Sequence, residues 1–250
     1  MRAMIRASIL TMLLTAVGMA QTSAPDVNTV VSRMQTAMGG RNHDRAYSVT
    51  REYRLVPEDP NKASRVVAEV NALPSGKKDY RITEGGGQAE NVVRKVLDHE
   101  TEVTNQNNGA VLTADNYDFV LAGTEAIDGH RCYVLQLKPK RDGKDILRGR
   151  AWVDADSYLV RQIAGTPTKS PSWWIKDLQV TLHYREMQGL WLQDSTQAVA
   201  QVRVVGKHTL TARALDVRTD TTLAGNLQTP VRKRSRRVDP ALLGAGVIRH

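Results

Sequence analysis

Strict alternation of apolar and polar residues marks two stretches in the second half of the chain. Apolar side chains fall on every second position in residues 178–184, and residues 196–204 follow the same pattern. A period of two is that of a strand with one dry face and one wet face. We therefore predict two regular strands, whose apolar faces carry Leu178, Val180, Leu182, Tyr184, Ala198, Ala200, Val202 and Val204.

A loop with two adjacent tryptophans precedes the first of these strands. Pro171 cannot join a strand ladder, and Trp173 and Trp174 follow it directly. Two neighbouring side chains cannot both face one core. At least one of the two rings is therefore expected at a rim, a mouth or an interface.

Helical spacing predicts two amphipathic helices in the first half of the chain. The first follows Asp26, a suitable N-cap residue, and ends at Gly39 and Gly40. The second spans residues 90–103 and carries Val92, Val93, Val96 and Leu97 on one side. Alternation between the two helices predicts strands over residues 46–56, 64–73 and 77–82.

Arg51 falls on the apolar face of the first of these strands. A long side chain at such a position can reach out to solvent at the end of the strand, which is the more common situation. It can also line a polar pocket inside a cavity. The sequence leaves both readings open.

Three consecutive glycines, Gly85 to Gly87, separate the strands from the second helix. A glycine run before a helix can cradle phosphate, but the G-x-x-x-x-G-K-[ST] and G-x-G-x-x-G contexts are missing. A flexible joint is the better reading. Our hypothesis is that the second helix acts as a movable lid over an apolar surface.

From Tyr117 onward the chain is predicted to be nearly all strand and turn. Asp128-Gly129, Asp142-Gly143, residues 154–157, Gln188-Gly189 and Gly206-Lys207 mark successive reversals. The intervals between them leave no room for crossover helices, so the strands must pair antiparallel. About ten strands and two helices predict an α+β, mostly β fold: one large curved sheet with helices against its concave face.

The first twenty residues have the pattern of a cleaved signal peptide. A basic region with Arg2 and Arg6 precedes an apolar run at residues 9–17 and a small-residue cleavage site at residues 18–20. An uncleaved anchor is the alternative. We expect a periplasmic protein with a single domain over residues 21–218. Cys132, the only cysteine, is expected to be a buried structural thiol.

Much of the net charge of +9 belongs to the C-terminal segment, residues 219–250. This basic tail, predicted to be flexible, carries Arg232, Lys233, Arg234, Arg236 and Arg237 as candidates for contact with a membrane surface. An exported protein seldom meets nucleic acid, so an anionic lipid surface is the better partner. A solvated tail without a partner is the alternative reading.

Catalytic motifs are not found in the sequence. Asp98, His99 and Glu100 are adjacent, but neighbouring positions of a helix point in different directions and form no site by themselves. Neither H-E-x-x-H nor G-x-S-x-G occurs, and the histidines lack metal-ligand spacing. We predict a protein that is not an enzyme, with no catalytic residues, no metal and no cofactor.

Several short motifs resemble the LolA-like group of bacterial outer-membrane lipoprotein-sorting proteins. They are Asn116-Tyr117-Asp118-Phe119, the run 129–140, Gly149-Arg150-Ala151-Trp152-Val153-Asp154, Pro171-Ser172-Trp173-Trp174 and Gly189-Leu190-Trp191-Leu192. The resemblance implies an unclosed antiparallel β-barrel whose hydrophobic concavity is covered by helices. It also implies a periplasmic protein that holds acyl chains.

One position departs from the pattern of the LolA-like carriers. They share an arginine immediately before a proline early in the sheet, and the nearest match here is Leu73-Pro74. A general lipid or lipopeptide binder therefore fits as well as a strict lipoprotein shuttle. The alternative is a lipid-sensing interaction protein that regulates an inner- or outer-membrane partner protein.

An acyl-binding role needs only an apolar concavity, because each methylene removed from water contributes ~0.8 kcal/mol. The apolar faces of the two regular strands are the candidate lining, although an ordinary core against the helices is the alternative for most of these residues. Trp173, Trp174 and Trp191 are the candidates for the mouth of the concavity, since aromatic rings tolerate the boundary between apolar and aqueous surroundings.

Overall fold

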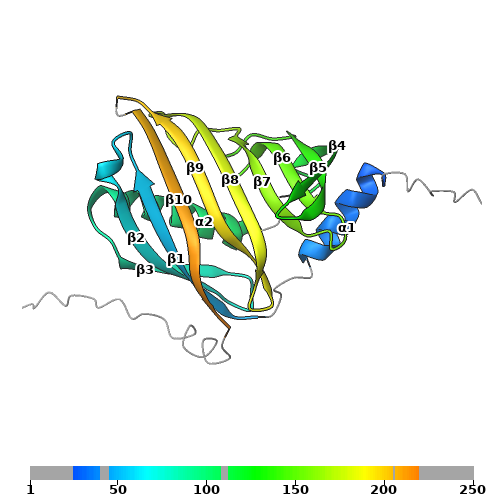
Figure 1. Cartoon of the computed structure of the whole chain (residues 1–250), viewed down its shortest axis with the longest axis horizontal. Helices are drawn as coiled ribbons and strands as arrows, with labels where there is room; N and C mark the ends of the chain where they lie inside the picture. Colours follow the sequence, from blue (N-terminus) through cyan, green and yellow to red (C-terminus); the bar gives the residue numbers. More distant parts are fainter. Residues whose placement is uncertain (1–24, 40–44, 108–111, 205, 220–250) are drawn as a thin grey trace, which may run out of the picture.

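In the part of the chain that the structure describes, ten antiparallel strands form one curved, unclosed sheet, and two helices pack against it (Figure 1). The computed structural model describes residues 25–39, 45–107, 112–204 and 206–219. The predicted signal peptide and the basic residues of the tail lie outside the described residues. The predicted fold class is confirmed.

Neighbouring strands in the sheet are consecutive along the chain, except for one pair, β1 and β10. Their order is β3-β2-β1-β10-β9-β8-β7-β6-β5-β4, so the first and last strands of the chain pair inside the sheet and β3 and β4 form the two edges. The strands are β1 Tyr47–Val56, β2 Ser64–Ala72, β3 Lys78–Glu84, β4 Tyr117–Ile127, β5 His130–Pro139, β6 Leu147–Asp154, β7 Val160–Pro167, β8 Ile175–Met187, β9 Leu190–Val202 and β10 Gly206–Arg218, with a short 3-10 helix η1, Pro60–Lys62, between β1 and β2.

Both predicted helices are present; the first has the expected bounds, whereas the second, predicted over residues 90–103, begins three residues earlier and ends four residues later. Helix α1, Val27–Gly39, begins after Asp26, whose carboxylate accepts the backbone N–H groups of Asn28 at 3.0 Å and Thr29 at 3.3 Å. Helix α2, Gly87–Asn107, begins at the third glycine of the run, where φ is +61°. Neither helix is long and apolar enough to cross a membrane.

The two helices lie on the same face of the sheet, which we call the inner face. Strand register shows this directly, because residues that pair across adjacent strands share a face. Starting at Tyr53, one such row passes through Ala212, Thr196, Leu182, Ile163, Ala151 and Leu135. Tyr53 packs with α2 at one end of the row, and Ile163, Ala151 and Leu135 pack with α1 at the other.

Each helix covers one half of the inner face. Val30, Val31 and Met34 of α1 belong to a core with strands β4 to β7, whereas Ala89, Val93 and Leu97 of α2 belong to a second core with β1, β2 and β10. Figure 1 shows α2 crossing the sheet beneath β1 and β10, and α1 beside the β4–β5 end. The strands between these two cores are β8 and β9.

The strands test two predictions from the sequence, one for Cys132 and one for Val204. Cys132 is buried and forms no disulfide, as expected, and burial raises the pKa of its thiol. The prediction that Val204 continues the second regular strand is wrong. Strand β9 ends at Val202, which pairs with Gly206 at the start of β10, so Val204 lies in the hairpin connection with φ +74°.

Candidate functional site

The inner-face residues of β8, β9 and β10 form a partly covered part of the sheet's apolar face, between the two cores. We call them the central groove: Val180, Leu182, Thr196, Ala198, Ala200 and Leu210, which share the face through the β8–β9 and β9–β10 registers. All six are only partly buried, whereas many inner-face residues under the two helices are buried. The groove therefore has an apolar surface that solvent or a ligand can reach.

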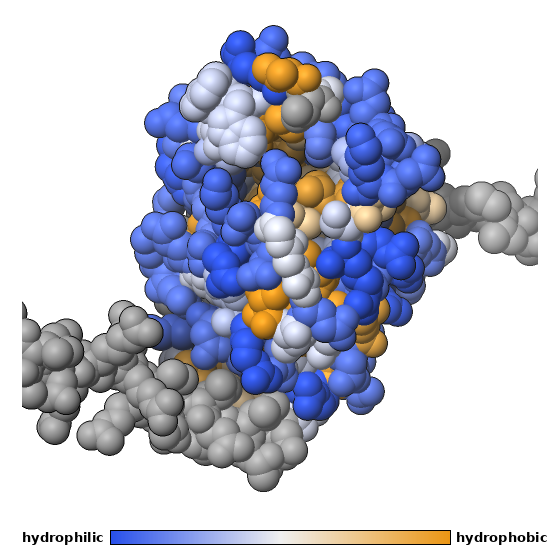
Figure 2. Space-filling view, turned by 90° about the vertical axis from the view of Figure 1, so that its left-hand side faces the viewer, coloured by the Kyte–Doolittle hydropathy of each residue, from blue (hydrophilic) through white to orange (hydrophobic). Residues whose placement is uncertain are grey.

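Small side chains line the middle strand of the central groove. The middle strand, β9, presents Thr196, Ala198 and Ala200 between larger residues such as Val180 and Leu210 on its neighbours. Four successive inner-face positions of β9, from Thr196 to Val202, span about 20 Å at ~3.3 Å per residue. Figure 2 shows hydrophobic residues in a hollow band between hydrophilic borders at the end of the molecule that carries β2 and β3.

Trp174 stands at one end of the central groove. Its ring lies 5.7 Å from the ammonium group of Lys95 on α2, within the range of a cation–π contact. Directly after it, Ile175 pairs with Val202 where β8 and β9 begin their ladder. The Trp174 ring thus links the loop before β8 to α2 at this end of the groove.

Polar side chains lie at the other end of the groove, between α2 and the sheet. We call them the buried polar cluster: Arg51 of β1, Tyr53 of β1, Lys78 of β3, Glu100 of α2 and Tyr184 of β8. Arg51 is 6% exposed, and its Nη1 atom donates to both carboxylate oxygens of Glu100, at 3.0 and 2.8 Å. The ammonium group of Lys78 is 3.3 Å from the same carboxylate. Of the two readings of Arg51 that the sequence left open, the structure selects the buried one.

Electrostatics within the buried polar cluster keep its ion pair charged. Burial would raise the pKa of Glu100, but the positive charges of Arg51 and Lys78 outweigh it and lower the pKa from 4.5 to about 2. Burial together with the Glu100 carboxylate raises the pKa of Tyr184 to about 12. The hydroxyl of Tyr53 is buried without a hydrogen-bond partner among the described residues, and burial raises its pKa to about 12.

The adjacent residues Asp98, His99 and Glu100 are directed to three different places. Asp98 accepts a hydrogen bond from the hydroxyl of Tyr80 on β3, and Glu100 binds Arg51. His99 lines a polar hollow of about 780 Å³ beside Arg141 and Asp145. The three side chains therefore form no common site, in agreement with the sequence reading.

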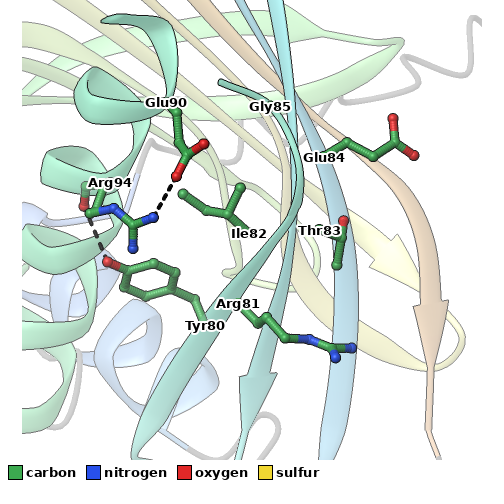
Figure 3. A pocket seen from close by; sticks show the side chains of 8 residues that line it. All are labelled: Tyr80, Arg81, Ile82, Thr83, Glu84, Gly85, Glu90 and Arg94. Carbon is green, nitrogen blue, oxygen red and sulfur yellow. Dashed lines mark hydrogen bonds and ion pairs between the residues drawn. The ribbon is translucent and has the colours of Figure 1, made fainter. Parts of the chain in front are cut away.

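A further hollow of about 350 Å³ lies between the edge strand β3 and the first turns of α2 (Figure 3). Tyr80 and Ile82 point toward the helix, while Arg81 and Thr83 point to the other side of the strand. Arg94 is paired with Glu90 at 2.6 Å, so the charges at this hollow are already matched. Because its lining is polar, this hollow does not suit an apolar chain. The residues around it instead help to hold α2 to the sheet.

Other residues singled out from the sequence are spread over the molecule. Trp173 is 82% exposed, whereas Trp191 is buried and its indole N–H donates to the carbonyl of Val160 at 3.0 Å. Val93 and Leu97 face the sheet from α2, Val92 is partly buried and Val96 is 38% exposed. Leu178 is partly buried beside an irregularity in the β8–β9 register.

The buried polar cluster is the part of the site that sequence reasoning did not assemble. Arg51 and Glu100 were each conspicuous, but they lie on a strand and a helix 49 positions apart. The signal that could have joined them is a single cation on an apolar strand face and a single anion near the apolar stripe of the next helix. Such charges need a partner when they are buried.

Comparisons with known proteins place the fold. One family model, described as an uncharacterized protein family, matches residues 100–226. No curated protein matches the sequence. Among solved structures, a domain named as an outer membrane lipoprotein-sorting protein from Vibrio parahaemolyticus is 13% identical, with a TM-score of 0.50 over 80% of this chain and 96% of that chain. A LolA superfamily protein from Nitrosomonas europaea is 12% identical, with a TM-score of 0.48 over 79% and 94%. The LolA-like fold expected from the sequence is confirmed.

Proposed function

Because this chain belongs to the uncharacterized protein family whose model matches residues 100–226 and has the LolA-like fold, we propose that it is a periplasmic protein that binds acyl chains of lipids or lipoproteins. The acyl chain lies in the central groove, along the inner face of β8, β9 and β10. In this role the protein carries lipids or lipoproteins toward the outer membrane.

The observation that carries this proposal is the partly exposed apolar surface of the central groove between two covered halves of one sheet. Ordinary cores bury such residues, as the cores under α1 and α2 do. An apolar chain laid along β9 would remove Ala198, Ala200 and Leu210 from water without needing a precisely placed polar group. At ~0.8 kcal/mol per methylene, ten buried methylenes would supply about 8 kcal/mol before the cost of ordering the chain.

Helix α2 serves in this proposal as a movable wall of the groove beside β10. Ala89, Val93 and Leu97 hold it to the sheet by apolar contact, and Glu100 holds it through Arg51 and Lys78. Gly85 and Gly87, with φ of +150° and +61°, provide the joint between α2 and β3. Movement about this joint would widen the groove for a ligand, with the ion pair as the contact that has to yield.

The test is mass spectrometry of lipids extracted from the full-length protein after purification from its native compartment. We expect a defined set of acyl lipids in near-stoichiometric amount. A Trp174→Ala variant is expected to retain several-fold less lipid, because the aromatic ring that contacts Lys95 at one end of the groove is gone. A wild-type protein free of lipid would contradict the proposal and favour the alternative, a protein-interaction role for the inner face.

A further inference from the structure

Two chain reversals meet at the end of the sheet where Trp174 stands. They are the loop before β8 and the hairpin connection between β9 and β10. The side chain of Arg203 donates from Nε to the carbonyl of Trp173 at 3.0 Å, and its backbone N–H donates to the carbonyl of Trp174 at 2.8 Å. These two bonds hold the tips of the two reversals side by side.

Each tip exposes a large apolar side chain. Trp173 is 82% exposed and Val204 is fully exposed, and both are among the few large hydrophobic residues that are exposed in the described part of the chain. Val204 also adopts φ +74°, a conformation that disfavours β-branched residues and that glycine or asparagine would accept more readily. An exposed valine in this conformation costs stability and contributes nothing to the core, so a contact outside the molecule is the better explanation.

Basic side chains surround the two apolar tips. Lys169, Lys176, Arg203 and Lys207 are exposed within residues 168–177 and 201–208, whose single acidic residue is Asp177. None of the four forms an ion pair with the described residues. Lys176 and Lys207 flank Gln201 across three neighbouring strands, which concentrates positive charge beside the tips. Glu58, close to Gly206, offsets only part of it.

We propose that this surface, the tryptophan rim formed by Trp173, Val204, Lys176, Arg203 and Lys207, docks on the surface of an anionic lipid bilayer. Tryptophan is favoured at the boundary between headgroups and acyl chains, and a valine tip can enter the same layer. The three cations of the rim, together with the nearby Lys169, match the negative surface potential of anionic lipids. A second protein is less well matched, because two single apolar side chains, Trp173 and Val204, surrounded by cations provide little contiguous apolar area.

Docking would bring the Trp174 end of the central groove to the bilayer. Trp174 follows Trp173 directly, and Ile175 and Val202 begin the inner-face ladder behind it. An acyl chain could then pass between bilayer and groove without crossing water. This consequence rests on the proposed function, whereas docking itself does not require that the groove binds lipid.

The experiment measures sedimentation of the full-length protein with vesicles of 70% phosphatidylcholine and 30% phosphatidylglycerol, and with pure phosphatidylcholine vesicles. We expect partition at least tenfold stronger into the anionic vesicles. A Trp173→Asp, Val204→Asp double variant is expected to lose at least tenfold of that partition. The matched control is Leu215→Asp, which replaces another apolar side chain that is 55% exposed on β10, and it should change partition less than twofold.

Two further measurements distinguish the rim from the basic tail as the docking surface, and docking by the rim from lipid binding in the groove. A variant with Arg232, Lys233, Arg234, Arg236 and Arg237 replaced by glutamine tests the basic tail, and loss of vesicle binding in that variant alone would overturn the role of the rim. Equal partition of the rim variant and the wild type would overturn it as well. Binding of a fluorescent fatty acid in the absence of vesicles should be unchanged in the rim variant, so failure of the groove and failure of the rim give different results.

Discussion

Arg51→Met is expected to lower the free energy of unfolding by about 3 kcal/mol, because it leaves the Glu100 carboxylate without its main partner. The pair spans the interior between β1 and α2, so its loss weakens the contact that holds α2 to the sheet. Lys78 remains 3.3 Å from Glu100 and limits the loss. Urea unfolding followed by circular dichroism at pH 7 measures the effect.

The matched control for this prediction is Arg54→Met, on the same strand. The Arg54 side chain is 63% exposed and its ion pair with Glu52 lies on the surface, so a change below about 1 kcal/mol is expected. Replacing both buried partners, Arg51→Met with Glu100→Met, should recover part of the stability, because no buried carboxylate is left unpaired. Equal stability of Arg51→Met and Arg54→Met would show that the buried pair does not hold α2.

The pH dependence gives the same prediction a second readout. The pKa of Glu100 is lowered from 4.5 to about 2 in the folded protein, so its ion pair stabilises the fold fully above about pH 4.5. That contribution is lost as pH falls from 4.5 toward 2, because the unfolded chain binds the proton first. The difference between wild type and Arg51→Met should therefore shrink over this interval. A difference that stays constant down to pH 2.5 would contradict the assignment.

Ala198→Trp is expected to weaken the binding of a fluorescent fatty acid by about fifteenfold. Ala198 lies at the middle of the central groove, opposite Val180 on β8 and Leu210 on β10. An indole ring at this position would occupy the space of at least two methylenes of a bound chain. At ~0.8 kcal/mol each, the loss of these contacts costs about 1.6 kcal/mol of binding free energy. This corresponds to about a fifteenfold increase in Kd.

Gln197→Trp is the control for the groove. Gln197 is exposed, and its partners Thr181 and Thr211 lie on the opposite face of the same strands. The same ring added one residue away should leave Kd within about twofold. An unchanged Kd in Ala198→Trp, or an equal loss in both variants, would show that the chain does not lie along β9.

The sequence predicted the fold well because its signals were local. Alternation with a period of two identified the strands, Asp26 identified the start of α1, and helical spacing placed the start of α2 within three residues of Gly87. Antiparallel order followed from the short distances between turns. What failed was a boundary: the alternation of residues 196–204 continues past the point where β9 turns, so Val204 was assigned to a strand face.

The candidate site was less accessible from the sequence because it depends on pairs that are distant along the chain. Trp173 and Val204 are brought together by Arg203, and Arg51 meets Glu100 only once α2 has packed on β1. Trp191, chosen because it is aromatic, is instead buried and bonded to a backbone carbonyl. Residue type indicated which side chains can stand at a boundary, but only the register decides which of them do.

Photo-crosslinking with a fatty acid that carries a diazirine at the end of its chain tests directly whether an acyl chain lies in the central groove. Tandem mass spectrometry of the digested protein then locates the labelled residues. We expect labels on the inner face of β8, β9 and β10, at residues such as Val180, Leu182, Ala198 and Leu210. Unlabelled fatty acid should suppress this labelling. Labels confined to outer-face residues such as Gln197 and Thr211, or labels that competitor does not suppress, would contradict this expectation.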